Sequence, residues 1–300
     1  MFSMNRLSPE MRSSIVRCLV EGNSLRATAR MTGTSLNTVT KLLTDLGVVC
    51  SLHQDRVMRD LPCERIQCDE IWTFVGAKAK NVKPDKREQG WGDVWTWVAL
   101  DADTKLVPTY QIGPRDMGTA QAFMVDVASR LRSRVQLTTD GLHAYLNAVD
   151  GAFNGKVDYA QLVKIYGTDP QAPRGRYSPP VCTGISSTVR SGDPDPEHIS
   201  TSYIERQNLT MRMSMRRFTR LTNGFSKKVE NLAAAVSLHF MHYNFCRVHK
   251  TLGTTPAVAG EMVDHVWTLD EVIGLLEHAE RAVPQKRGPY KPRKPRSVSD

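Results

Sequence analysis

The strongest constraint on the fold is a change in the hydrophobic pattern near residue 64. Residues 66–75 are rich in apolar and aromatic side chains, and after a charged stretch the apolar pattern resumes at 94–100 and again at 106–112. Such segments, bounded by polar turn residues, are typical of β-strands. The sequence Asp-Ala-Asp-Thr-Lys at 101–105 supplies a turn between the second and third segments. We therefore predict a three-stranded antiparallel meander.

Helical and strand patterns alternate after this meander. Asp116 is a good N-terminal signal for a helix, and small or apolar residues recur at helical spacing from there to Arg134. Residues 135–139 predict a short strand that ends at Asp140, and residues 141–149 predict another helix. The order strand, strand, strand, helix, strand, helix favours an α/β or α+β layered fold, with the core of the protein in this region.

The second half of the chain is mainly helical in pattern. Residues 167–200 contain six prolines and several glycines, which predict an insert or a long loop. Helical patterns follow at 201–220, 229–247 and 269–281. The chain has 300 residues, which corresponds to about two average domains.

The first 50 residues contain a pattern that fits a helix-turn-helix. This motif needs a small residue where its helices cross, a glycine in the turn and apolar residues on the inner face of the second helix. The positions that meet these needs are Ala29, Gly33, Val39 and Leu42. Thr34 or Ser35 would cap the second helix, and a small helical bundle with a glycine turn is the alternative interpretation. The polar residues left to face a DNA groove are Asn37, Thr38, Thr40 and Lys41.

The charge of the chain favours a polyanionic partner. Lys and Arg number 40 against 31 Asp and Glu, which gives a net charge of +9. The excess is concentrated at 203–228 and at 285–300. In the latter segment basic residues such as Lys291 and Arg293 alternate with proline, so we expect a tail that lies in a DNA minor groove and adds affinity without choosing sequence.

Cysteine spacing and hydropathy indicate in which cellular compartment we expect the protein. The six cysteines include no Cys-x-x-Cys pair, so neither a zinc ribbon nor a disulfide framework is indicated and a reducing compartment fits best. Charged residues interrupt the first 17 positions, which argues against secretion. The most apolar later stretch, 232–245, is shorter than the roughly 20 residues that a membrane helix needs. We expect a cytoplasmic, nucleoid-associated protein with no membrane partner.

Three acidic residues, far apart in sequence, are candidates for a metal site. Asp69 lies in the first predicted strand, Asp140 ends the fourth, and Glu205 lies in the first turn of the helix after the proline-rich segment. Two divalent cations that act on a phosphodiester need hard oxygen ligands on rigid elements. Strand alternation puts Glu70 on the opposite face from Asp69, so Glu70 is a rival to Asp69 and not its partner.

Each of these acids also has a structural interpretation that needs no catalysis. Asp69 could end a charge pair, and Asp140 could cap the helix that follows it. Glu205 forms a capping box with Ser202 in the pattern Ser-x-x-Glu.

The helix that carries Glu205 adds independent information. If the helix continues to 220, Leu209, Arg212 and Arg216 share the face of Glu205 at offsets of 4, 7 and 11. A basic face is usually only solvated, but one that carries a metal-binding carboxylate suits a phosphate backbone. Another face is more typical of core, and it holds Met211, Met215 and Phe218.

Several passages of the chain resemble one known family. These are Cys-Asp-Glu-Ile-Trp-Thr-Phe-Val at 68–75, Thr-Asp-Gly-Leu-His-Ala-Tyr at 139–145, Ile-Glu-Arg-Gln-Asn-Leu-Thr-Met-Arg at 204–212, and Phe-Ser-Lys-Lys-Val-Glu at 225–230. They resemble transposases of the insertion-sequence-one type, a family with a DDE triad on a ribonuclease-H-like fold. The similarity extends over roughly 65–245, and the segment 243–256 is similar to the closing segment of many DDE transposases and integrases.

The resemblance implies a specific set of site residues and partners. Asp69, Asp140 and Glu205 would be the triad, and they would hold two Mg²⁺ ions, with Mn²⁺ tolerated. Apart from the resemblance, the basic charge of 203–228 leads us to expect DNA contacts from Arg212, Arg216, Arg217 and Lys227. The fold would be α/β: a ribonuclease-H-like mixed sheet with flanking helices, preceded by the small all-α helix-turn-helix domain.

Two departures from the family pattern stand out. The interval between Asp140 and Glu205 is long, so 167–200 resembles an insertion. A zinc-finger-like cysteine cluster at the N-terminus is absent, since Cys18 and Cys50 alone cannot build a four-ligand site. Recognition of element ends would then fall to the helix-turn-helix.

We therefore expect an insertion-sequence transposase that cleaves and joins DNA, with a homo-oligomer formed on the DNA because two ends must be joined together. The expected domains are a helix-turn-helix over 1–60, a catalytic domain over 61–260, and a C-terminal helix with a basic tail over 261–300. Two alternatives stay open: a non-catalytic DNA-binding protein derived from a transposase, and a nuclease of the same fold that cuts without rejoining.

Overall fold

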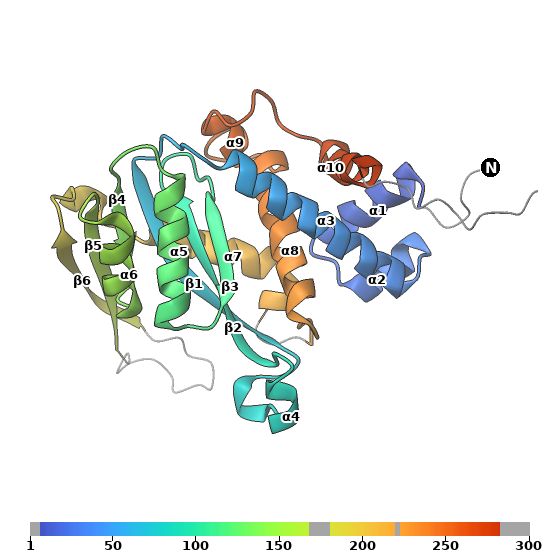
Figure 1. The fold of residues 1–300 in the computed structure, drawn as a ribbon, viewed down its shortest axis with the longest axis horizontal. Coiled ribbons are helices and arrows are strands. Elements are labelled where there is room, and N and C mark those ends of the chain that lie inside the picture. The colour runs from blue at the N-terminus through green and yellow to red at the C-terminus, as the bar shows by residue number, and fades with distance from the viewer. Residues whose placement is uncertain (1–6, 168–180, 220–222, 283–300) are drawn as a thin grey trace, which may run out of the picture.

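The computed structural model describes residues 7–167, 181–219 and 223–282. Its centre is a six-stranded mixed sheet with the order β3-β2-β1-β4-β5-β6 (Figure 1). The pairs β1–β4 and β4–β5 are parallel, whereas β1–β2, β2–β3 and β5–β6 are antiparallel. The strands are β1 (Arg65–Val75), β2 (Gly92–Asp101), β3 (Thr109–Gly113), β4 (Gln136–Thr139), β5 (Asp158–Gly167) and β6 (Val181–Ser191).

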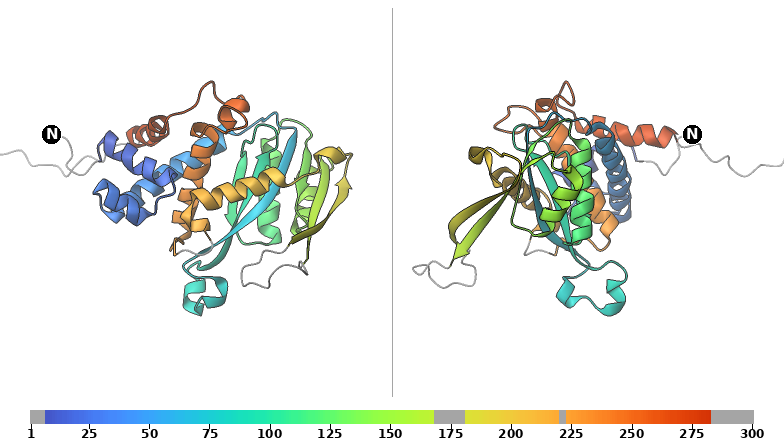
Figure 2. Two further views of the ribbon diagram at one scale, coloured as in Figure 1. Left: turned by 180° about the vertical axis from the view of Figure 1, so that it is seen from behind. Right: turned by 60° about the vertical axis from the view of Figure 1, so that its left-hand side comes forward.

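Helices cover both faces of this sheet. α5 and α6 lie on one face and α7 crosses the other, as the two opposite views show (Figures 1 and 2). The helices are α1 (Pro9–Val20), α2 (Leu25–Thr32), α3 (Leu36–Val57), α4 (Pro84–Arg87), α5 (Met117–Arg130), α6 (Ala144–Phe153), α7 (Ser202–Ser214), α8 (Val229–Met241), α9 (Pro256–Ala259) and α10 (Leu269–Ala282). The arrangement is a mixed α/β fold that is compatible with the ribonuclease-H-like class.

Buried aromatic side chains fix the first helical layer to the sheet. Trp97 of β2 is fully buried, and its ring centroid lies 6.0 Å from that of Phe123 in α5 and 5.4 Å from that of Tyr145 in α6. The indole N–H donates to the carbonyl of Pro114 at 3.2 Å, so the polar atom of this core residue is satisfied. This cluster packs α5 and α6 against β2.

The N-terminal helices pack onto the body of the protein through α8. α3 and α8 cross closely because Gly47 faces Ala234, and a Cβ at position 47 would overlap that residue. α8 is in turn fixed to β3, since the ring of Tyr110 stacks on that of Phe240 at 4.7 Å and its hydroxyl donates to Ser237 at 2.8 Å. One continuous core therefore runs from the N-terminal helices into the sheet.

The helices and the turn of the expected helix-turn-helix lie where the sequence predicts them. Gly33 ends α2 with a φ of 67°, in the left-handed region that favours glycine. Ser35 is the cap of α3, since its hydroxyl accepts the Thr38 N–H at 3.0 Å. Val39 and Leu42 are buried. That this unit binds DNA stays a prediction.

The antiparallel meander, the helix after Asp116 and the strand before Asp140 are confirmed, but two predictions are wrong in part. Within the segment 167–200, expected to be an insert or a long loop, residues 181–191 form β6 and pair with β5. The helix expected over 201–220 ends at Ser214, where the chain turns so that Met215 and Phe218 enter the core. A tertiary contact holds this turn, since the carbonyl of Arg217 accepts the hydroxyl of Thr73 in β1 at 2.7 Å.

No helix in the described parts of the chain is long and apolar enough to cross a membrane.

Candidate metal and DNA site

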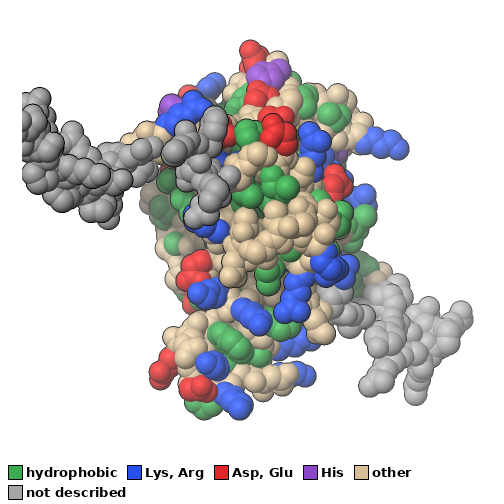
Figure 3. Space-filling model, turned by 90° about the vertical axis from the view of Figure 1, so that its right-hand side faces the viewer, with side chains coloured by type: hydrophobic (Ala, Val, Ile, Leu, Met, Phe, Trp, Pro, Cys, Tyr) green, Lys and Arg blue, Asp and Glu red, His purple; other side chains and the backbone are tan. Residues whose placement is uncertain are grey.

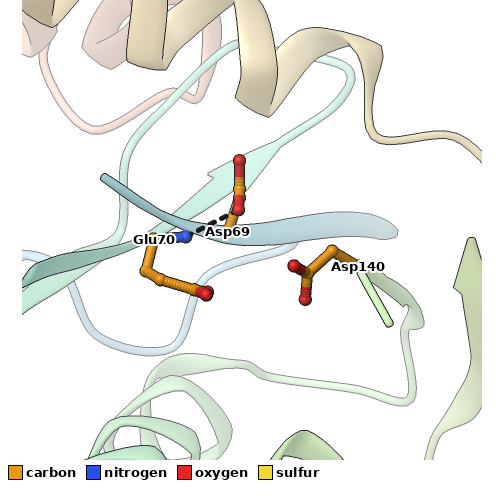
Figure 4. Close-up of side chains that lie close together, drawn as sticks. All are labelled: Asp69, Glu70 and Asp140. Carbon is orange, nitrogen blue, oxygen red and sulfur yellow. Dashed lines mark hydrogen bonds between the residues drawn. The ribbon is translucent and has the colours of Figure 1, made fainter. Parts of the chain in front are cut away.

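Parallel pairing of β1 and β4 brings two of the predicted acids together. Cys68 is opposite Thr139 in this ladder, so the next residue of each strand, Asp69 and Asp140, lies at the same edge of the sheet. Oxygen atoms of Asp69, Glu70 and Asp140 all lie within 4.8 Å of one another (Figure 4). The cluster therefore contains both predicted aspartates and also Glu70, which the alternation of side chains had set apart from them.

Asp69 is held by one partner on α7. Its Oδ2 accepts a hydrogen bond from the side-chain amide of Asn208 at 2.8 Å, and its Oδ1 accepts the N–H of Glu70 at 2.8 Å. Burial, together with the nearby charges of Glu70 and Asp140, raises the pKa of Asp69 from 3.8 to about 7. Asp69 is thus a partly protonated group at neutral pH in the absence of a cation.

Glu70 points to the opposite side of β1, toward α5 and α6 (Figure 4). Its carboxylate accepts hydrogen bonds from the Arg115 guanidinium at 2.5 Å and from the Tyr145 hydroxyl at 3.1 Å, and its side chain is only 2% exposed. A second nitrogen of Arg115 lies 3.7 Å from Asp140 Oδ2. Arg115 therefore lies between two acids and neutralises part of their charge, although burial still raises the pKa of both Glu70 and Asp140.

Glu205 lies outside the three-acid cluster but close to it. Its charge contributes to the raised pKa of Asp140. Glu205 Oε2 is 2.5 Å from the Lys164 ammonium of β5, and its Oε1 accepts the Thr201 hydroxyl at 2.7 Å. The capping box with Ser202 is not formed, because Thr201 and not Ser202 precedes the helix.

Two residues on one face of β1 hold α7 over this edge of the sheet. The side-chain oxygen of Gln67 accepts the N–H groups of Tyr203 and Ile204 at 3.0 and 3.1 Å, which satisfies the exposed donors of the helix N-terminus. Asp69, two residues further along the same face, binds Asn208 one turn later. The first turn of α7, with Glu205, is therefore fixed beside the middle of β1, where β4 ends.

The donor set fits a divalent cation. Carboxylate oxygens are the ligands that Mg²⁺ and Mn²⁺ prefer. The raised pKa values of Asp69, Glu70 and Asp140 show that buried negative charge is crowded here, and a cation would favour the ionised carboxylates. Glu70 is already engaged by Arg115 and Tyr145, which leaves Asp69 and Asp140 as the better ligands.

The predicted DNA-contacting residues of the C-terminal half fall into two groups. Arg212 lies in α7, whereas Arg216 and Arg217 follow it in a short 3₁₀ helix. Arg212 lies within α7 at the expected offset of 7 from Glu205, but the prediction that Arg216 shares this helical face is wrong, because α7 ends at Ser214. Arg216 and Lys227 are exposed. Arg217 is partly buried, its Nε donates to Ser226 at 2.8 Å, and burial lowers its pKa to about 10.

The predicted DNA-contacting residues of α3 are distributed around that helix. Asn37 and Lys41 are exposed, and Lys41 forms an ion pair with Asp45. Thr38 is half-buried, and the Thr40 hydroxyl donates to the carbonyl of Leu36 at 2.8 Å. The tail residues Lys291 and Arg293 lie outside the described residues.

Basic side chains also gather beyond the predicted set. Figure 3 shows Lys and Arg side chains over the lower half of one face, above and on the projection that carries α4. The segment between β1 and β2 carries five basic residues: Lys78, Lys80, Lys83, Lys86 and Arg87. Only two acids, Asp85 and Glu88, lie in the same segment.

Sequence reasoning missed several residues of the site. Asn208 lies in the passage 204–212, three positions after Glu205. A polar side chain there, on a helix that packs on the sheet, could have indicated a contact with the acids. Arg115 and Lys164 gave no signal, because each acts across strands or helices that are distant in sequence.

Comparisons with known proteins give little help. No protein-family model matches the chain, and no curated protein matches it. Among solved structures, a cryo-EM structure of a piggyBac transposase synaptic complex with hairpin DNA is similar over 93% of this chain and 73% of that chain, with 11% identity and a TM-score of 0.36. A crystal structure of a pre-cleavage Mos1 transpososome is similar over 81% and 80%, with 10% identity and a TM-score of 0.25. Likenesses this weak establish neither a shared fold nor a shared function.

Proposed function

We propose that this protein is a DNA transposase of an insertion sequence, which binds element ends, cleaves DNA strands and transfers them into target DNA. The observation that carries the proposal is the place where β4 ends beside the middle of β1. There Asp69 and Asp140 lie side by side, and Gln67 and Asn208 hold the first turn of α7, with Glu205, beside them.

In this proposal Asp69, Asp140 and Glu205 are the ligands of the catalytic metal ions. Two bound Mg²⁺ ions, or Mn²⁺ in their place, would activate the attacking oxygen and stabilise the leaving oxygen of a phosphodiester. Glu205 pairs with Lys164 in the structure, so the proposal requires that this ion pair opens when the site is loaded.

The residues around the acids have supporting roles. Arg115 holds Glu70 and offsets its charge, so that the cluster tolerates three crowded and partly buried carboxylates. Asn208 orients Asp69 by donating to one carboxylate oxygen, which leaves the other lone pairs for a cation. These contacts fix the acids before DNA binds, and such preorganisation lowers the cost of assembling the site.

The DNA substrate is supported by charge. The exposed Arg216 and Lys227 and the basic segment between β1 and β2 offer cations to a phosphate backbone. We assign Arg212, Arg217 and the tail residues Lys291 and Arg293 to the same non-specific contact, and Asn37, Thr38, Thr40 and Lys41 of α3 to the recognition of element ends. A homo-oligomer on DNA follows from the need to join two ends together.

The experiment that tests this function uses a DNA fragment that carries the sequences flanking this gene. Wild-type protein, Glu205→Gln and Asp140→Asn are compared for Mg²⁺-dependent nicking and for strand-transfer products. We expect the wild type to cut and join, while both variants bind the DNA but do neither. Cutting without joining would identify a nuclease instead, and three equally inactive proteins that bind DNA would favour a non-catalytic DNA-binding protein.

A further inference from the structure

A cavity of about 610 Å³ lies between the N-terminal helices and the segment that joins α7 to α8. Its walls come from the α1–α2 turn, from α3, from residues 214–217 and 223–227, and from α8. None of Asp69, Glu70, Asp140 or Glu205 lines it, so it is separate from the acid cluster. Its volume is in the range of small-molecule sites, about 300–1,000 Å³.

The basic side chains of the cavity walls favour an anionic ligand. Four basic residues line it, namely Arg26, Arg216, Arg217 and Lys227, and no Asp or Glu does so among the described residues. Arg217 is partly buried, and the hydrogen bond from its Nε to Ser226 fixes its guanidinium at the wall. A planar, fixed guanidinium is well suited to phosphate oxygens.

The interior of the cavity offers a different chemistry. Leu25, Leu43, Leu238 and Phe225 supply apolar surface. His239 also lines it, and the Nε2 atom of this buried side chain has no hydrogen-bond partner among the described residues. Buried polar atoms are rarely left unpaired, so an unpaired one at a cavity wall points to a ligand atom. Burial lowers the pKa of His239 to about 3, so the ring is neutral and pairs with a polar edge rather than with a charge.

We propose that this cavity binds a nucleotide, with the phosphate at Arg216, Arg217 and Lys227 and the base in the apolar interior beside His239. Inorganic phosphate would leave the apolar interior and His239 unused, and an apolar ligand would place no negative charge beside the four basic side chains of the walls. A nucleotide joins a phosphate to a flat ring with polar edges, and both halves of the cavity are then satisfied.

Two sources can supply this chemistry. One is a nucleotide turned out of a DNA strand that passes between the N-terminal helices and α7, and this source rests on the proposed function. The other is a free mononucleotide. Both place the same phosphate and base in the same cavity, so they are separated by experiment.

The test uses the full-length protein in three titrations followed by calorimetry or fluorescence. The first uses the four free 5′-mononucleotides, and the second uses inorganic phosphate. The third uses duplex DNA from the flanking sequences with 2-aminopurine at successive positions, because its fluorescence rises when the base leaves the stack. Binding of a mononucleotide identifies a free ligand, and a fluorescence rise at a defined position identifies a nucleotide of DNA.

Variants tie either signal to the cavity. Ala235→Leu fills the space from α8, and Lys227→Ala removes an exposed cation that carries no packing. Lys156→Ala is the matched control, since Lys156 is exposed and does not line the cavity. We expect at least a tenfold loss of the binding signal in Ala235→Leu, a several-fold loss in Lys227→Ala and no change in the control, with all proteins folded by thermal melting.

Three results would overturn the inference. These are the absence of a signal with both mononucleotides and DNA, an equal affinity for inorganic phosphate, and a signal that Lys227→Ala leaves intact. If Ala235→Leu does not fold, the smaller change Ala235→Val takes its place, because Lys227 also contacts the DNA backbone in the proposed function and its loss alone does not locate the signal in the cavity. DNA cleavage by the wild type is measured separately, with Asp140→Asn as its inactive control. If the wild type cleaves DNA but gives no nucleotide signal, only this inference is refuted. If it gives the nucleotide signal but does not cleave DNA, only the proposed function is refuted.

Discussion

Replacement of Asp69 by Asn is expected to stabilise the metal-free protein while it removes the function. The pKa of Asp69 rises from 3.8 to about 7 on folding because the carboxylate is buried beside Glu70 and Asp140. A shift of about 3 units corresponds to roughly 4 kcal/mol at about 1.4 kcal/mol per unit. Asn has nearly the same size and carries no charge, so Asp69→Asn avoids this cost.

The pH dependence gives the sign of the effect. The folded protein holds a proton on Asp69 between about pH 4 and pH 7, where the unfolded chain has lost it. The free energy of unfolding of the wild type therefore falls as the pH rises through this window, and the contribution from Asp69 is fully unfavourable above pH 7. The advantage of Asp69→Asn should reach a few kcal/mol at pH 8 and vanish near pH 4.

Urea unfolding at pH 4, 6 and 8, with and without millimolar Mg²⁺, measures this difference. Mg²⁺ should stabilise only the wild type at pH 8, by about 2.7 kcal/mol at 100 times its dissociation constant. Asp85→Asn is the matched control, because Asp85 is exposed and lies outside the acid cluster. The reasoning is refuted if Asp69→Asn is no more stable than the wild type at pH 8, or if its advantage is the same at pH 4.

Three further predictions concern the surroundings of the site. Lys164→Met removes the ion pair that occupies Glu205, so half-maximal cleavage should need several-fold less Mg²⁺, and an unchanged requirement would contradict the idea that this pair must open. Gly47→Ala should lower the free energy of unfolding by about 1–3 kcal/mol, because the added Cβ overlaps α8. The control is Gly274→Ala, where no atom lies within 4 Å of the added Cβ. Urea unfolding should show this control to be neutral or stabilising. Gln67→Leu leaves two N–H groups of α7 without their acceptor. It should therefore lower the free energy of unfolding by about 1 kcal/mol and speed amide hydrogen exchange in the first turn of α7. Unchanged exchange would count against the role of this contact.

The sequence predicted those parts of the fold that depend on local pattern. The strands that carry Asp69 and precede Asp140 were found because each is an apolar run bounded by turn residues. The helix after Asp116 was found because its cap and its spacing agree, and the side chain does accept the Thr119 N–H at 2.8 Å. Periodicity and turn chemistry are properties of a few neighbouring residues, so a single sequence shows them.

The parts that were missed depend on tertiary packing. β6 follows a proline-rich stretch and is a strand only because β5 pairs with it. The helix after Thr201 ends early, and the turn that follows is held by the hydrogen bond from Thr73 of β1 to the carbonyl of Arg217. Glu70 belongs to the acid cluster although its side chain leaves β1 on the opposite face from Asp69. Its carboxylate lies near that of Asp140, which follows the end of β4. No local pattern contains these contacts.

The most direct test of the central claim is to locate bound Mn²⁺ by anomalous scattering in crystals of the wild type and of Glu205→Gln. The account predicts Mn²⁺ bound by Asp69 and Asp140 in the wild type, with Glu205 turned from Lys164 toward the metal, and a lower metal occupancy in Glu205→Gln. Mn²⁺ bound elsewhere, or bound equally in both proteins with Glu205 still paired to Lys164, would contradict the claim that these three acids form one metal site.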